Sequence, residues 1–172
     1  MKYKEIQKIM CGNPFLKQAI QLKRVGELDR ALYFCHKAIE MNSNLAWGFY
    51  ELGNVLSKQN TQEAIDEAVT AYHVAIQIKP ESAVYYQSLG KALIKKNNIH
   101  ETLAIYNYLC HLNVELAEVS YELMVFLIQN GFLTELEKSL LSNCTQKFLY
   151  RIHYNLGVAC LKASMPEVAE KY

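Results

Sequence analysis

Hydrophobic residues in this chain recur in short amphipathic stretches, all but one of them centred on a small residue. In the clearest stretch, Phe49, Leu52 and Leu56 are spaced three and four residues apart around Gly53, which places them on one face of a helix. The equivalent positions along the chain are separated by 34, 37, 34 and 33 residues. They are Ala19, Gly53, Gly90, Met124 and Gly157. A period of this length predicts an array of stacked helical hairpins.

Each period contains two predicted helices with a turn residue between them. Gly and Asn tolerate the left-handed conformation that ends a helix, and they fill four of the five turns. The turn residues are Gly26, Asn60, Asn97, Gly131 and Ser164. The small residue of the first helix allows the two helices to approach to the short end of the roughly 8–10 Å range. Because Met124 is large, we expect looser packing in the fourth unit.

Local signals also predict where some helices begin. Asn13 before Pro14 predicts a helix start, with the asparagine as its cap. Thr134 followed by Glu137 predicts a capping box that opens the second helix of the fourth unit. The second unit has three additional residues around positions 60–66, which should lengthen its helix or its turn.

The segments FYELGNVL and AVTAYHVAIQIKP, and again YYQSLGKAL and ETLAIYNYL, resemble the tetratricopeptide repeat (TPR) family. That family's pattern is an aromatic residue, Leu-Gly and Tyr, followed by Ala, Phe or Tyr, Ala and Pro. The resemblance implies an all-α fold, a right-handed α-solenoid of about five TPR helical hairpins, with a lead-in helix at residues 1–11. The expected repeats are 12–45, 46–82, 83–116, 117–149 and 150–172, the last of them incomplete.

Composition and charge narrow the functional class. The 172 residues are 51% hydrophobic and 20% charged, which is ordinary for a globular protein. A net charge of +1 implies no bulk attraction to nucleic acid or to an anionic membrane. There is no apolar run of the roughly 20 residues that span a bilayer and no secretory segment, so we expect a cytoplasmic protein. Five cysteines without a CxxC pair argue against a disulfide framework and a zinc knuckle.

In a TPR array the first helices line a concave groove, so the resemblance implies that residues flanking the small position project into it. The position three residues before the small residue is often Tyr. The position five residues after it is mostly Lys or Arg. Tyr offers contact area at low entropic cost, together with a hydroxyl group. The alternative is that the tyrosines pack as ordinary lining and that the basic residues complement the helix dipole. The candidate peptide-binding residues are Tyr50, Asn54, Lys58, Gln87, Lys91, Lys95, Tyr121, Val125, Tyr154 and Lys162.

One TPR subclass binds the C-terminal carboxylate of a peptide with paired Asn and basic residues. Asn54, Lys91 and Lys95 match the places of the second and third repeats in such a clamp. Leu16 and Ile20, however, stand where the first repeat would supply Lys and Asn. An acidic or extended peptide with apolar side chains fits this groove better, because the second half of the groove is apolar.

The sequence holds no motif that indicates catalysis. GxGxxG, P-loop, GxSxG and HExxH patterns are all missing. His36 and His73 share one position in consecutive second helices, yet two histidines without a further ligand make a poor metal site. We therefore expect no enzyme activity, cofactor or metal, and no nucleic-acid partner.

The expected function is a non-catalytic scaffold or adaptor that binds a peptide segment of a partner protein in the concave groove. The alternative is the N-terminal recruiting arm of a larger enzyme of glycosyltransferase or methyltransferase type. The last repeat stops at Tyr172, within its second helix, whereas terminal repeats normally carry a polar capping helix. The sequence therefore predicts either a chain that continues, or a partner or second copy that covers this end.

Overall fold

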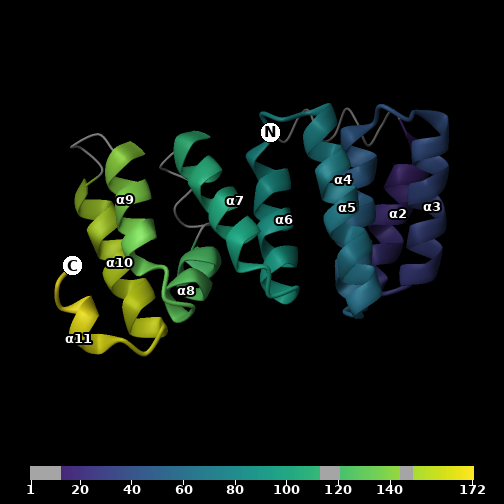
Figure 1. The fold of residues 1–172 in the computed structure, drawn as a ribbon. Coiled ribbons are helices and arrows are strands. Elements are labelled where there is room, and N and C mark those ends of the chain that lie inside the picture. The colour runs from purple at the N-terminus through teal and green to yellow at the C-terminus, as the bar shows by residue number, and fades with distance from the viewer. Residues whose placement is uncertain (1–12, 113–120, 144–148) are drawn as a thin grey trace. The chain divides into compact units, whose positions relative to one another are not determined.

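The computed structural model describes residues 13–112, 121–143 and 149–172, and every regular element in these ranges is an α-helix (Figure 1). The predicted lead-in helix at 1–11 lies outside the described residues. The helices are α2 (Pro14–Val25), α3 (Leu28–Met41), α4 (Ala46–Gln59), α5 (Gln62–Ile78), α6 (Ala83–Lys95), α7 (Ile99–Leu112), α8 (Tyr121–Gln129), α9 (Leu133–Asn143), α10 (Leu149–Lys162) and α11 (Pro166–Ala169). The predicted all-α helical-repeat class is confirmed.

The chain divides into two compact units, Met1–Ala92 and Leu93–Tyr172. In the first unit, α3 packs against α2 and α4, and α4 packs against α5. In the second unit, α8 contacts α7, α9 and α10, and α11 packs against α10. Most of these contacts join helices that are neighbours in sequence, as stacked repeats require.

Every predicted turn residue adopts a left-handed backbone conformation. The φ angles are 85°, 57°, 57°, 86° and 62° in chain order, and no other described residue has a positive φ. The five residues are Gly26, Asn60, Asn97, Gly131 and Ser164. Glycine reaches this region freely, whereas a residue with a Cβ is disfavoured there by roughly 1–2 kcal/mol. The turn prediction is confirmed at all five sites.

The predicted cap at the start of α2 is also confirmed. The side chain of Asn13 accepts a hydrogen bond of 3.1 Å from the Leu16 N–H, and Pro14 occupies the first helical position. The Asn13 amide also donates to the Ala38 carbonyl at 3.3 Å, which ties the start of α2 to the end of α3.

The predicted capping box at Thr134 is wrong. Helix α9 begins at Leu133, so Thr134 already lies within its first turn. The Leu136 N–H donates to the Phe132 carbonyl at 3.1 Å, which closes that turn two residues before the position the prediction required. The Phe132 ring, just before α9, also lies edge-on to the His100 ring of α7, with 6.1 Å between the ring centroids.

The three additional residues of the second repeat lengthen a helix rather than a turn. Helix α5 has 17 residues, against 14 in the equivalent helix α3. The α4–α5 turn keeps its single left-handed residue, Asn60, and Thr61 then caps α5 by accepting a hydrogen bond of 3.2 Å from the Ala64 N–H.

The small residue of the second repeat has a direct packing reason. A Cβ added at Gly53 would lie 2.6 Å from the Tyr72 ring, which comes from α5 and is 2% exposed. In the fourth repeat, the larger Met124 is only 1% exposed. The looser packing expected there stays a prediction. Leu140, which is also buried, occupies there the repeat position of Tyr72, so the fourth repeat has a smaller residue on the second helix and a larger one on the first.

Candidate peptide-binding surface

Three candidate residues lie on α4 in the first unit. Tyr50, Asn54 and Lys58 are spaced four residues apart, which places them on one face of the helix. Tyr50 is half-buried, and its ring centroid lies 4.6 Å from that of Trp47 and 5.1 Å from that of Tyr85. The packing therefore fixes the direction of the Tyr50 ring.

Asn54 is held in place by a side chain from the second helix. The Tyr72 hydroxyl donates a hydrogen bond of 2.9 Å to the Asn54 Oδ1. Burial raises the pKa of this hydroxyl, so it remains a protonated donor. The Asn54 amide group forms no hydrogen bond within the described residues, and the side chain is partly exposed. Its two N–H donors are therefore available to a partner.

Lys58 has a contact within the chain. Its Nζ donates a hydrogen bond of 3.2 Å to the Lys23 carbonyl in the last turn of α2. The alternative considered for the basic residues, that they complement the end of a helix, thus applies to Lys58. The Lys23 side chain forms a buried ion pair with Glu51, which joins α2 to α4.

The next three candidates lie on α6. Gln87 is half-buried, and Lys91 and Lys95 are exposed. Lys91 follows Gln87 by four residues and precedes Lys95 by four, so all three lie on one face of this helix.

In the second unit, the structure brings together Tyr121 from α8 and Lys162 from α10. The Tyr121 hydroxyl donates a hydrogen bond of 3.1 Å to the Val158 carbonyl, and the Lys162 Nζ lies 4.9 Å from the centroid of the Tyr121 ring. Burial raises the pKa of Tyr121. Tyr154 is 62% exposed, and Val125 is half-buried. Tyr121 and Tyr154 therefore differ in role although they share one repeat position.

Several residues near the surface were not among the candidates. Trp47 and Tyr85 complete the aromatic cluster around Tyr50, and Tyr72 orients Asn54. The sequence carried a signal for Trp47, because it precedes Tyr50 by three residues on the same helix. The first repeat contributes no such surface, since Leu16 and Ile20 are buried in the core.

We compared the sequence and the structure with known proteins. No family model and no curated protein matches the sequence. Among solved structures, YrrB, described as a TPR protein with an unusual peptide-binding site, is similar with a TM-score of 0.63 and 26% identity, over 95% of this chain and 86% of YrrB. The chain has the fold of a TPR protein.

Two further TPR-fold structures resemble this TPR protein over most of its length. MamA from Desulfovibrio magneticus RS-1 has a TM-score of 0.66 and 16% identity, over 91% of this chain and 88% of MamA. TTC0263, a thermophilic TPR protein of Thermus thermophilus, has a TM-score of 0.60 and 17% identity, over 91% of this chain and 84% of that protein. At these identities the likeness shows the helical-repeat solenoid fold.

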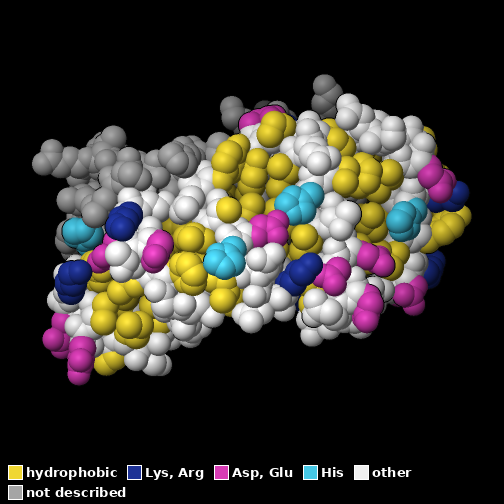
Figure 2. Space-filling model, viewed as in Figure 1, with side chains coloured by type: hydrophobic (Ala, Val, Ile, Leu, Met, Phe, Trp, Pro, Cys, Tyr) yellow, Lys and Arg dark blue, Asp and Glu magenta, His cyan; other side chains and the backbone are white. Residues whose placement is uncertain are grey.

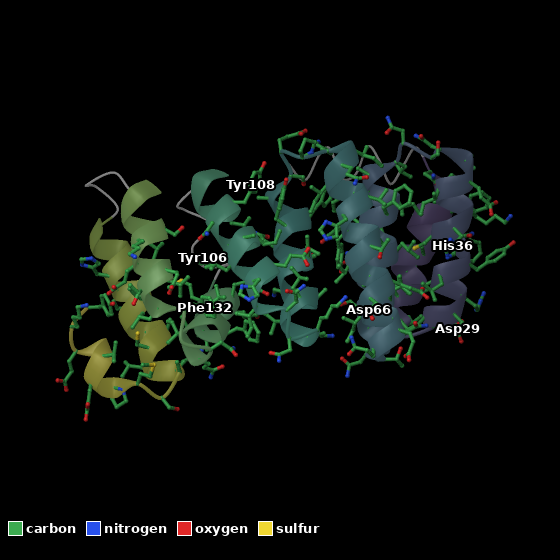
Figure 3. The ribbon with its side chains drawn as sticks, viewed as in Figure 1. Asp29, His36, Asp66, Tyr106, Tyr108 and Phe132 are labelled. Atoms are coloured by element: carbon green, nitrogen blue, oxygen red, sulfur yellow. The ribbon has the colours of Figure 1, made fainter. Side chains whose placement is uncertain are left out.

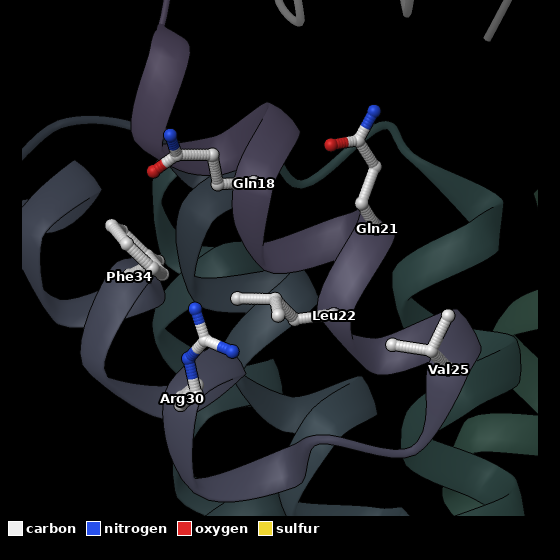
Figure 4. Close-up of a pocket in the computed structure, with 6 residues that line it drawn as sticks. All are labelled: Gln18, Gln21, Leu22, Val25, Arg30 and Phe34. Carbon is white, nitrogen blue, oxygen red and sulfur yellow. The ribbon is translucent and has the colours of Figure 1, made fainter.

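Two pockets can be described in the first unit of this TPR protein, and neither contains any of the ten candidate residues. The first, of about 250 Å³, lies between α2 and α3. Leu22 and Val25 from α2 face Arg30 and Phe34 from α3 there, with Gln18 and Gln21 at the α2 side (Figure 4). The second, of about 230 Å³, lies on the second helices and is taken up below.

The described residues of this TPR protein offer little reactive chemistry. They contain no cluster of three or more His, Cys, Asp or Glu side chains that could bind a metal ion. None of the described helices is long and apolar enough to cross a membrane. Cys35 and Cys160 are fully buried, and burial, followed by the charge of Glu51, raises the pKa of the Cys35 thiol to about 12. A thiol that stays protonated is a poor nucleophile.

Proposed function

We propose that this TPR protein is a non-catalytic interaction scaffold whose first helices hold an extended, acidic peptide segment of a partner protein. Within each unit, the candidate residues named above are the proposed contacts. The similarity to TPR proteins, among them one with a peptide-binding site, supports a role in protein interaction.

The observation that carries the proposal is the hydrogen bond from Tyr72 to Asn54. Because the Oδ1 is occupied, the amide cannot turn over without losing that bond, so Asn54 presents donors outward. Amide donors match the carbonyl oxygens of an extended peptide backbone and the oxygens of a carboxylate. The neighbouring Tyr50 ring offers a rigid apolar surface at low entropic cost.

The acidic character of the proposed partner follows from the charge of the first helices. Helices α2, α4 and α6 contain six basic residues and one acidic residue, Glu51, which is paired with Lys23. The basic residues are Lys17, Lys23, Arg24, Lys58, Lys91 and Lys95. A surface of one sign attracts a partner of the other sign and disfavours one of its own.

Selection of random peptides displayed on phage tests this proposal. Peptides enriched on the wild-type protein should be rich in Asp or Glu with interspersed apolar residues, and their affinity can be measured by fluorescence anisotropy. Asn54→Ala should weaken the enriched peptides about tenfold, as expected when a charged or backbone acceptor loses its donor. Tyr72→Phe, which releases the amide without removing it, should give a smaller loss.

The control is His36→Ala, which alters an exposed residue of α3 away from the first-helix surface and should leave the affinity unchanged. If acidic peptides are not enriched, or if the enriched acidic peptides bind wild type and Asn54→Ala with equal affinity, the first helices do not form the proposed site.

A further inference from the structure

The second helices of the first unit enclose an apolar hollow that the proposed function does not use. It measures about 230 Å³, below the roughly 300–1,000 Å³ of small-molecule sites, so its size suits one or two side chains of a protein partner. Apolar side chains of α4 form its floor, α3 contributes His36, and α5 forms the other wall. The lining residues are His36, Phe49, Leu52, Leu56, Glu67, Thr70, Ala71 and Val74.

This hollow lies on the opposite side of α4 from the candidate peptide-binding residues. At about 100° per residue, Phe49, Leu52 and Leu56 fall on one face of the helix, and Tyr50 and Asn54 point away from it. The two sets of residues do not overlap, so the two surfaces can be tested with different substitutions.

The α5 wall of the hollow is acidic, in contrast to the basic first helices. Helix α5 contains three acidic residues, Glu63, Asp66 and Glu67, and no Lys or Arg. Glu63 and Glu67 are exposed, lie one turn apart, and form no ion pair or hydrogen bond within the described residues. Figure 3 places Asp66 on α5 and His36 on α3.

The basic residues of α3 do not offset this charge. Arg30 is paired with Glu27 at 2.5 Å, and Lys37 with Glu40 at 2.8 Å, which leaves Asp29 unpaired in the described chain. Figure 2 shows acidic side chains over α3 and α5 next to patches of hydrophobic side chains. The surface around the hollow thus combines an apolar recess with unneutralised negative charge.

We propose that this face of the first unit is a second docking surface, and that it binds a basic segment of another protein. One apolar side chain of that segment enters the hollow, and neighbouring Lys or Arg side chains lie beside Glu63 and Glu67. Charge complementarity identifies the occupant, because an apolar anchor flanked by positive charge matches the recess and its acidic wall. The proposal does not depend on the function proposed for the first helices.

Three synthetic fluorescent peptides test the proposal with the full chain. One is a helix-forming peptide of Lys and Leu, the second has Glu in place of every Lys, and the third has Ser in place of every Leu. Only the Lys/Leu peptide should bind, with an affinity that falls as salt is added. Glu63→Lys/Glu67→Lys should weaken it about tenfold or more. Thr70→Trp, an exposed position at the hollow, should block the recess and abolish binding.

The control is Gln21→Ala, an exposed residue of α2 that does not line the hollow, which should leave the affinity for the Lys/Leu peptide unchanged. Circular dichroism melting establishes that each variant is folded. The proposal is overturned if the Ser peptide or the Glu peptide binds as well as the Lys/Leu peptide, or if the charge reversal has no effect. It is also overturned if light scattering shows a dimer that Glu63→Lys/Glu67→Lys dissociates, because the occupant is then a second copy of this chain.

Discussion

Adjacent first helices are joined by a buried ion pair in the first unit and by an aromatic contact in the second. Between α2 and α4, the side chains of Lys23 and Glu51 are only 16% and 6% exposed. Between α8 and α10, the Tyr121 hydroxyl binds a backbone carbonyl and the Lys162 ammonium lies over its ring. A buried charge that loses its partner is costly, whereas a half-exposed neutral hydrogen bond contributes modestly. The contact in the first unit should therefore cost more stability when one of its partners is removed.

The two units also differ in the sizes of the residues at equivalent positions of their paired helices. In the second repeat, Gly53 lies under a large ring from the second helix. In the fourth, Met124 is as deeply buried, and the second helix supplies Leu140 in place of that ring. What the repeat conserves between the two helices is thus filled volume, and glycine is only one way to provide it.

Removing one partner of the buried ion pair should have the largest effect. Glu51→Ala leaves the Lys23 ammonium without its partner and should lower the free energy of unfolding by about 3–5 kcal/mol, measured by urea denaturation. Lys23→Met/Glu51→Leu removes both charges and should restore most of that stability. If Glu51→Ala costs less than about 1 kcal/mol, the pair behaves as a surface salt bridge and the contrast between the units is lost.

Filling the glycine position should have the next largest effect. Gly53→Ala places a Cβ 2.6 Å from the Tyr72 ring and should destabilise by about 1–3 kcal/mol, which Tyr72→Leu in the same chain should largely reverse. Gly157→Ala is the matched control, because its Cβ would meet no atom closer than 3.5 Å. That variant should be neutral or gain up to about 1 kcal/mol from helix propensity. Equal losses in both variants would contradict the volume argument.

A smaller loss is expected where the second unit joins its first helices. Tyr121→Phe removes the hydrogen bond to the Val158 carbonyl and should cost about 0.5–1.5 kcal/mol in thermal or urea unfolding. Tyr154→Phe, at the exposed tyrosine of the same repeat position, should change stability by less than about 0.5 kcal/mol. A loss above about 3 kcal/mol for Tyr121→Phe would mean that this contact contributes as much to stability as the ion pair of the first unit, and would contradict the comparison.

The rates at which the two buried thiols are labelled should show which unit opens more readily. In the native protein, iodoacetamide labelling followed by peptide mass spectrometry should modify Cys160 before Cys35. Cys160 lies on α10, and the four-residue helix α11 that packs on α10 has no buried residue, so local opening should expose that thiol first. Simultaneous labelling of the two thiols would show that both units open together.

The same thiols set a pH dependence. Because the pKa of Cys35 rises from 9.0 in the unfolded chain to about 12 in the folded one, its protonated form favours the fold below pH 9. That contribution should be lost as pH rises from about 9 to 12, and Cys35→Ala should remove this part of the alkaline decline.

The sequence predicted the features that depend on single residues. The five turns and the Asn13 cap follow from the conformational freedom of Gly and Asn and from one side-chain oxygen, and the structure has them all. It did not predict the pairing of Lys23 with Glu51 or of Tyr72 with Asn54, because those contacts depend on how separate helices pack. The capping box at Thr134 was wrong because the helix already begins at Leu133.

The opposite charges of the first and second helices have a consequence for handling the protein. A net charge of +1 suggests a molecule that no ion exchanger retains. However, α2 and α4 carry four basic residues against one acidic, and α3 and α5 carry five acidic against two basic. A charged resin responds to the face that it meets, so near neutral pH and low salt the chain should adhere to both cation and anion exchangers.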